Sequence, residues 1–204
     1  MRSHSSESLT SAASRHIWTG RSLLSSHRGH AQLSILTAPD ARLKQKSKPV
    51  ETVDQQIRRL MDDMLETMYA APGIGLAAAQ VGVLQRILVL DLAKDGEDKR
   101  PIRMANPEII WVSDDDDSHE EGCLSVPEHY ASVTRPRAIR VRYLDHQNEI
   151  RELEADGLLA VVIQHEMDHL DGVLFIDHLS ALKRNMILRK LTKSKKAEPV
   201  PTRL

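Results

Sequence analysis

The sequence predicts an α+β fold in which antiparallel sheets pack around a central helix, with a further helix near each end of the domain. Three observations support this fold class. Residues 157–163 are apolar almost throughout, which is typical of a helix that is buried on all sides. Residues 138–144 alternate apolar and charged side chains, as a strand with one solvated face does. The segment from Asp145 to Asn148 is a turn signal, so residues 149–154 can pair back as a hairpin.

Length and composition exclude several classes of protein. A chain of 204 residues suggests one domain with appendages, and a hydrophobic content of 41% is enough for a core. The net charge of −1 gives no reason to expect DNA as a partner. No apolar run is long enough to cross a membrane, so we expect no membrane partner. The single cysteine, Cys123, allows no intramolecular disulfide, which fits a reducing compartment.

Composition also predicts the limits of the folded domain. Residues 1–32 are rich in serine, carry four arginines and contain one acidic residue. This composition is similar to that of a mitochondrial transit peptide, and an artefactual start is the alternative. We expect residues 1–32 to be a disordered extension, residues 33–191 to form the domain, and the basic, proline-containing residues 192–204 to be a disordered tail.

The first helix is predicted from a capping pattern and a helical period. Thr52 to Gln55 matches a capping box, in which the threonine caps the helix. Apolar residues then recur every three or four positions from Val53 to Met68. Pro72 and Gly73 are expected to end this helix.

Three further segments have simple interpretations. Residues 86–92 are apolar and predict a strand. The acidic run 114–117 lacks the alternating spacing of a calcium-binding loop, so we expect a solvated loop. Residues 180–191 predict a last helix. Its inward-facing side chains are expected to be Leu182, Met186 and Ile187.

The central helix carries the pattern His165-Glu166-x-x-His169. Histidines four apart lie on one face of a helix, where both can hold one divalent metal. Glu166 projects about 100° further round the helix, where it can contact a metal-bound water. This pattern is a signature of hydrolytic metal sites. The alternative is a pair of core or surface histidines, but polar groups in a buried helix need partners, which favours a metal.

A catalytic site of this kind takes three protein ligands and leaves one position open. One protease variant would have its third histidine at Phe175, which cannot coordinate. Glu198 lies in the tail, and no spacing rule supports Asp177 or His178. Cys123 is the better candidate, although a lone cysteine can also be a small buried hydrophobe.

Three blocks of sequence extend this interpretation. They are Gly-Ile-Gly-Leu-Ala-Ala-Ala-Gln at 73–80, Glu-Gly-Cys-Leu-Ser at 121–125 and Gln-His-Glu-Met-Asp-His at 164–169. In this order they resemble the three motifs of the bacterial peptide deformylases, and the resemblance runs from about Leu33 to Leu191. It implies a metal-dependent hydrolase that removes the N-terminal formyl group from formylmethionine of newly synthesised polypeptides and releases formate. It also implies one Fe²⁺ per subunit, with Zn²⁺, Ni²⁺ or Co²⁺ as substitutes.

The resemblance also assigns residues. The metal ligands are Cys123, His165 and His169. Glu166 is the general base, and the catalytic oxyanion donors are the Gln80 amide and the Leu124 backbone N–H; one such donor contributes about 3 kcal/mol. An arginine that matches Arg135 pairs with Asp168.

The substrate is expected to add as a strand, in contact with Ile74, Gly75, Glu121, Gly122, Leu158, Val161 and Val162. Tyr130 stands where many family members carry an arginine, so preferences beyond methionine are left open.

The expected partners are N-formylmethionyl nascent peptides. The basic last helix and tail predict contact with ribosomal RNA, or else a solvated basic face. A cytoplasmic location in a bacterium is expected, with the mitochondrial matrix as the alternative if residues 1–31 are a transit peptide. Two competing hypotheses are a metalloprotease and a non-catalytic ribosome-associated protein. The presence of Gln80, Cys123 and Glu166 argues against the second.

Overall fold

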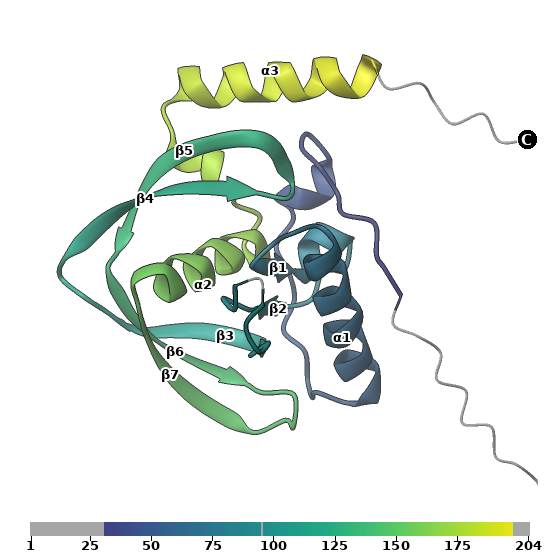
Figure 1. Ribbon diagram of the computed structural model, residues 1–204, viewed down its shortest axis with the longest axis vertical. Coiled ribbons are helices and arrows are strands. Elements are labelled where there is room, and N and C mark those ends of the chain that lie inside the picture. Colours follow the sequence, from purple (N-terminus) through teal and green to yellow (C-terminus); the bar gives the residue numbers. More distant parts are fainter. Residues whose placement is uncertain (1–30, 95, 198–204) are drawn as a thin grey trace, which may run out of the picture.

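The computed structural model describes residues 31–94 and 96–197 and confirms the predicted α+β class (Figure 1). Its three α-helices are α1 (Gln55–Ala70), α2 (Gly157–Leu170) and α3 (Ala181–Ala197). Its strands are β1 (Gly75–Ala77), β2 (Ile87–Leu90), β3 (Ile102–Val112), β4 (Asp116–Cys123), β5 (Val126–Pro136), β6 (Ala138–Leu144) and β7 (Ile150–Asp156). Three short 3₁₀ helices are η1 (Ala41–Lys44), η2 (Ala78–Val81) and η3 (Phe175–His178).

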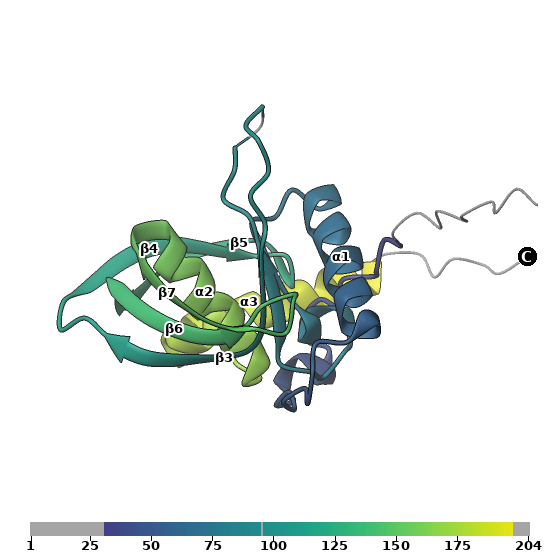
Figure 2. The same ribbon diagram turned by 90° about the horizontal axis from the view of Figure 1, so that it is seen from below.

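The strands form two antiparallel sheets. The larger has the order β1-β2-β3-β6-β7, and the smaller is the ribbon β4-β5. Helix α2 lies between the ribbon and the larger sheet, while α1 lies to one side of both (Figure 1). In the view from below, the loop that joins β2 to β3 projects away from the rest of the domain (Figure 2). The arrangement therefore surrounds α2 with strands.

Helix α1 begins at a different cap from the predicted one. The Asp54 carboxylate accepts a hydrogen bond from the Ile57 N–H at 2.9 Å, so Asp54 is the N-cap. Thr52, the predicted cap, instead bonds through its hydroxyl to Asn148. The capping-box prediction is wrong because aspartate caps a helix as well as threonine does and here stands two residues closer to it. The predicted apolar period is present, with Met61, Met64 and Met68 fully buried on one side of the helix.

Helix α2 is buried because almost every side is apolar. Ala160, Ile163 and Leu170 are fully buried and pack with strand residues such as Leu88. Gly172 has a φ of +75°, and a Cβ there would lie 2.7 Å from the Lys44 carbonyl oxygen. Only glycine fits this close approach, so Gly172 ends the helix just after its C-cap, Asp171.

The β4-β5 ribbon was not predicted. Asp116 and Asp117 belong to β4 and pair with Pro136 and Arg135, so the predicted loop over residues 114–117 is wrong for these two residues. The ribbon is difficult to recognise because β4 reads Asp-Asp-Ser-His-Glu-Glu-Gly-Cys and has no alternation of apolar side chains. Strand pairing with β5 decides its conformation.

The predicted last helix is present, but two of its side chains face the other way. Leu182 is 74% exposed and Met186 is 49% exposed, whereas Leu191 is buried. The contact with the core is made by Ile187, Leu188 and Leu191. The helix continues to Ala197, so the part of the predicted tail at 192–197 is helical.

Residues 1–30 and 198–204 lie outside the described residues, and the predictions made for them stay untested. Among the described helices, none combines the length and the apolar character needed to cross a membrane.

Candidate active site

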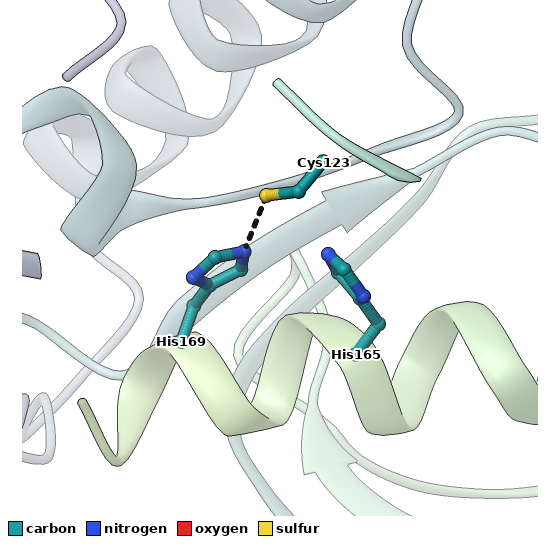
Figure 3. Close-up of side chains that lie close together, drawn as sticks. All are labelled: Cys123, His165 and His169. Atoms are coloured by element: carbon teal, nitrogen blue, oxygen red, sulfur yellow. Dashed lines mark hydrogen bonds between the residues drawn. The ribbon is translucent and has the colours of Figure 1, made fainter. Parts of the chain in front are cut away.

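Cys123, His165 and His169 converge at the centre of the domain, and their ligand atoms all lie within 4.8 Å of one another. Cys123 ends β4, while the two histidines share one face of α2, four residues apart (Figure 3). The Cys123 Sγ lies 3.2 Å from His169 Nε2. The structure therefore brings together the three residues that were predicted to hold a metal.

The histidine rings are held in defined orientations. His165 Nδ1 lies 2.7 Å from Glu121 Oε2, which leaves Nε2 as the nitrogen available for a ligand. Burial lowers the pKa of His169 well below its usual range, so this imidazole is neutral. Neutral imidazoles are the form that binds metals.

Glu121 is the centre of a buried ionic network. Arg135 donates from Nε to Glu121 Oε1 at 2.6 Å and from Nη2 to Oε2 at 3.0 Å. Burial alone would raise the pKa of Glu121, but hydrogen bonds from His165 and Arg135 lower it to about 2. The sequence interpretation placed Glu121 among the substrate-binding residues. Glu121 lines the cavity, but both of its carboxylate oxygens are already bound within this network, and its contact with a substrate stays a prediction.

Arg135 also makes the predicted pair with Asp168, at 2.9 Å from Nη1 to Oδ2. The same carboxylate oxygen lies 2.8 Å from His178 Nε2. His178 was considered only as a candidate ligand, and nothing in the sequence signals its contact with Asp168. Asp177, the other candidate, binds Lys44 and the Leu174 N–H. Neither residue belongs to the Cys-His-His cluster.

Glu166 lies beside the cluster and is only 4% exposed. Its Oε2 is buried and has no hydrogen-bond partner among the described residues. Burial raises the pKa of Glu166 to about 7. A carboxyl group with such a pKa can accept and return a proton near neutral pH.

Gly75 leaves the space that Glu166 occupies. A Cβ at position 75 would lie 2.4 Å from Glu166 Oε1, which is closer than atoms can approach. We expect Gly75→Ala to displace the carboxylate and to lower kcat by about 100-fold, the size of effect that a 1 Å misplacement can have. Kinetics of the variant would be compared with its metal content and thermal midpoint, both of which should change little. Full activity would show that the position of Glu166 does not matter.

Gln80 is held by both ends of its amide. Its Oε1 accepts a hydrogen bond from the Ala77 N–H at 2.8 Å. Its Nε2 therefore faces the cluster, 3.1 Å from Ser125 Oγ and 3.6 Å from Cys123 Sγ. This orientation directs amide hydrogens towards the cluster, as an oxyanion donor requires. Ser125 is buried and was not predicted as part of the site.

A short N-terminal segment, Leu36 to Ala38, joins these two motifs. The Leu36 N–H donates to the Gln80 carbonyl at 2.7 Å, and the Ala38 N–H donates to the Ser125 carbonyl at 2.8 Å. The segment was missed because such backbone contacts leave no mark on side-chain patterns.

A cavity of about 500 Å³ opens in front of the cluster. Val161 and Val162 are buried in its wall, whereas Ile74 and Leu158 are 43% and 53% exposed at its rim. The cavity thus gathers the predicted substrate-binding residues Ile74, Gly75, Glu121, Gly122, Leu158, Val161 and Val162 and the predicted catalytic residues Gln80, Leu124 and Glu166.

The cluster fits a metal ion by its chemistry. A thiol and two imidazoles are the ligands that zinc and other late transition metals prefer. The Ser125 N–H lies 3.4 Å from Cys123 Sγ, where it stabilises a thiolate. Each histidine is buried, and His165 has the carboxylate partner that metal-binding histidines commonly have.

Fold and site together define an α+β hydrolase whose Cys-His-His cluster can hold one metal ion. The family model for polypeptide deformylase matches residues 32–185, and the chain belongs to this family. A peptide deformylase from Phenylobacterium zucineum is 61% identical over 163 residues, which cover 80% of this chain and 96% of that protein. The crystal structure of peptide deformylase from Ehrlichia chaffeensis matches with a TM-score of 0.78 and 43% identity, covering 82% of this chain and 98% of that one. A structure of the enzyme from that organism in complex with actinonin matches with the same TM-score and 44% identity, covering 81% and 99%.

Proposed function

We propose that the protein removes the N-terminal formyl group from formylmethionine of newly synthesised polypeptides and releases formate in a metal-dependent reaction. The observation that carries this proposal is the buried, unpartnered carboxylate oxygen of Glu166 beside the Cys-His-His cluster, at the wall of an apolar cavity. Burying such a group is costly, so its retention points to a chemical role.

Cys123, His165 and His169 would hold the metal, for which we propose one Fe²⁺ per subunit, with Zn²⁺, Ni²⁺ or Co²⁺ as substitutes. When bound, a divalent metal supplies Lewis acidity for the hydrolysis of an amide. Glu121 keeps the imidazole of His165 oriented, and Arg135 keeps Glu121 charged.

Glu166 acts first as the general base and then as the general acid of the reaction. Its carboxylate takes a proton from the attacking water, and the water oxygen forms a bond to the formyl carbon. The same proton then passes to the nitrogen of the methionine as the carbon–nitrogen bond breaks. The products are formate and a free amino terminus. A pKa of about 7 lets Glu166 perform both steps near neutral pH.

Gln80 and Leu124 act on the carbonyl oxygen of the formyl group. Because Gln80 Oε1 is bound to the Ala77 N–H, its amide hydrogens stay directed at the cluster. We propose that they and the Leu124 N–H donate to this oxygen as negative charge develops on it. Donors fixed before the reaction stabilise the transition state without reorganising.

The peptide itself would bind as an added strand. In the described residues, β1 pairs only with β2 and β4 pairs only with β5, so each has an edge available for backbone hydrogen bonds. The methionine side chain would enter between Ile74, Leu158, Val161 and Val162. Apolar contacts of this kind discriminate between similar side chains by only about 1–3 kcal/mol.

Formate release tests the proposal directly. Protein purified anaerobically and loaded with iron is incubated with formyl-Met-Ala-Ser, and formate is measured against time. We expect formate to appear in proportion to enzyme, and none to appear from unformylated Met-Ala-Ser. No formate from the iron-loaded protein would refute the proposed function.

Removal of Cys123 is expected to abolish stoichiometric metal binding, because two imidazoles remain where three ligands are needed. The chain has one cysteine, so a sulfur-to-metal charge-transfer band in the Co²⁺ protein can come only from Cys123. The band should disappear in Cys123→Ala and persist in His146→Ala, which changes an exposed histidine. Retention of stoichiometric metal with unchanged ligation would instead support a metalloprotease-like ligand set.

The ribosome contact and the cellular location remain predictions. The exposed cations of α3, such as Lys183 and Lys190, support a ribosome contact only by their charge. The relatives named above are bacterial, which supports a cytoplasmic location in a bacterium. The mitochondrial alternative depends on residues 1–31, nearly all of which lie outside the described residues.

A further inference from the structure

The 3₁₀ helix η3 reaches the Cys-His-His cluster by two routes. Phe175, its first residue, is buried, and the Phe175 ring stacks on the ring of His165 with the two centroids 6.2 Å apart. His178, its last residue, lies at the surface with its side chain 37% exposed. His178 Nε2 nevertheless lies 2.8 Å from Asp168 Oδ2, the oxygen that also binds Arg135. The second route therefore begins at a residue that solvent can reach.

A series of hydrogen bonds leads from His178 to the imidazole of a proposed metal ligand. Asp168 accepts from Arg135 Nη1 at 2.9 Å, and the other two nitrogens of the same guanidinium donate to Glu121. Glu121 Oε2 lies 2.7 Å from His165 Nδ1. These bonds join ionised groups and are buried from Arg135 inwards, so they are strong and well oriented. Because the guanidinium is a rigid plane, a shift at Nη1 also turns the nitrogens that hold Glu121.

The outermost bond fixes the Asp168 carboxylate from a second side. A carboxylate that is paired with an arginine can only accept hydrogen bonds, so His178 donates from Nε2. The two donors to Oδ2 come from different elements, Arg135 from β5 and His178 from η3. The Asp168 side chain is 25% exposed, so water would compete for this oxygen if His178 could not donate. With both donors in place, the carboxylate has one defined position beside Arg135.

We propose that His178 is a positioning residue for the metal site. Its bond to Asp168 holds the Arg135 guanidinium in place. Through Glu121, the guanidinium holds the His165 imidazole in the orientation that binds metal. The proposal rests on the ligand set given under the proposed function. Groups that orient a metal-binding histidine directly change metal affinity by about 10–100-fold; His178 acts from further out and through partly exposed groups, so we expect about fivefold.

Release of metal from the Co²⁺ protein tests this role without any substrate. The protein is mixed with excess EDTA, and the decay of the charge-transfer band from Cys123 to Co²⁺ is followed. His178→Leu should speed the decay about fivefold and shift the ligand-field bands of the bound Co²⁺, because the His165 ring is held less firmly. His178→Gln should release metal at nearly the wild-type rate, since the glutamine amide can donate to Asp168 in place of Nε2.

Two further variants separate this role from a general loss of stability. In an Asp168→Ala background the series of bonds is already broken, so adding His178→Leu should not speed the release further. His119→Leu is the matched control, because His119 has a similar exposure of 32% and lies 3.4 Å from a carboxylate oxygen of Asp117. It should release metal as the wild type does. The comparison of His178→Leu with His178→Gln decides the question even where Asp168→Ala does not fold.

The outcomes separate this proposal from the proposed function. Equal release rates in the wild type and His178→Leu would overturn it, and so would an equal acceleration in His178→Gln or His119→Leu. An effect of His178→Leu that persists in full without the Asp168 carboxylate would also overturn it, because His178 would then act only through the packing of η3. Wild-type protein that binds no stoichiometric Co²⁺ would refute the proposed ligand set itself.

Discussion

Glu166→Gln is expected to lower kcat for formate release by about 10²–10⁴-fold, the contribution that a positioned general base makes. Glutamine has the same shape as glutamate but cannot accept the proton of the attacking water. The metal content should stay at the wild-type level, because Glu166 is not one of the three converging ligands. The protein should also become slightly more stable, since a buried carboxylate without a partner on one oxygen is replaced by a neutral amide.

Steady-state kinetics, metal analysis and thermal unfolding of the same preparations would check these three expectations. Glu149→Gln provides a control, because it makes the same chemical change at an exposed position. Wild-type kcat in Glu166→Gln would show that another group moves the proton.

Arg135→Met is expected to lower the free energy of unfolding by about 3–5 kcal/mol, as the loss of one partner of a buried ion pair does. Arg135 and Glu121 are both 5% exposed, and Asp168 is partly buried. Without the guanidinium, two carboxylates remain beside each other with only His165 and His178 to bind them. The metal site should loosen as well, because Glu121 orients His165.

Urea unfolding of wild type and variant would measure the change. Arg140→Met is the matched control, because Arg140 pairs with Glu154 across two strands but its side chain is 43% exposed; we expect a loss of about 0–1 kcal/mol there. Adding Glu121→Gln to Arg135→Met should recover part of the stability by removing the unpaired charge. An equal, small loss at both arginines would mean that the buried network contributes little.

The central part of the fold could be predicted because its sequence pattern is strong. An unbroken apolar run can only be buried, so the position of α2 followed from residues 157–163. The alternation of apolar and charged side chains, followed by a turn signal, likewise predicted strands β6 and β7. The metal ligands were predicted from the spacing of the two histidines on this helix and from the resemblance of the Cys123 motif to that of the peptide deformylases.

The parts that could not be predicted depend on contacts between distant segments. The ribbon β4-β5 has polar residues on both faces, because one face points to solvent and the other holds the Glu121–Arg135 network. A helical period shows that Leu182 and Met186 share a face, but it cannot show whether another element covers that face. The contact of His178 with Asp168 joins a 3₁₀ helix to α2, and no local spacing indicates it.

The segment from Leu36 to Ala38 sets a limit on how far the protein can be shortened. Leu33 is already bound through its N–H to Thr67, and the next bonds reach the two motifs that flank the catalytic cluster. Trimming that stops before Leu33 leaves every one of these bonds in place. Trimming to Asp40 would remove them all, and with them the backbone link that this segment makes between the motifs of Gln80 and Ser125. The amino-terminal boundary of a minimal enzyme therefore lies in front of Leu33, well before the first helix begins.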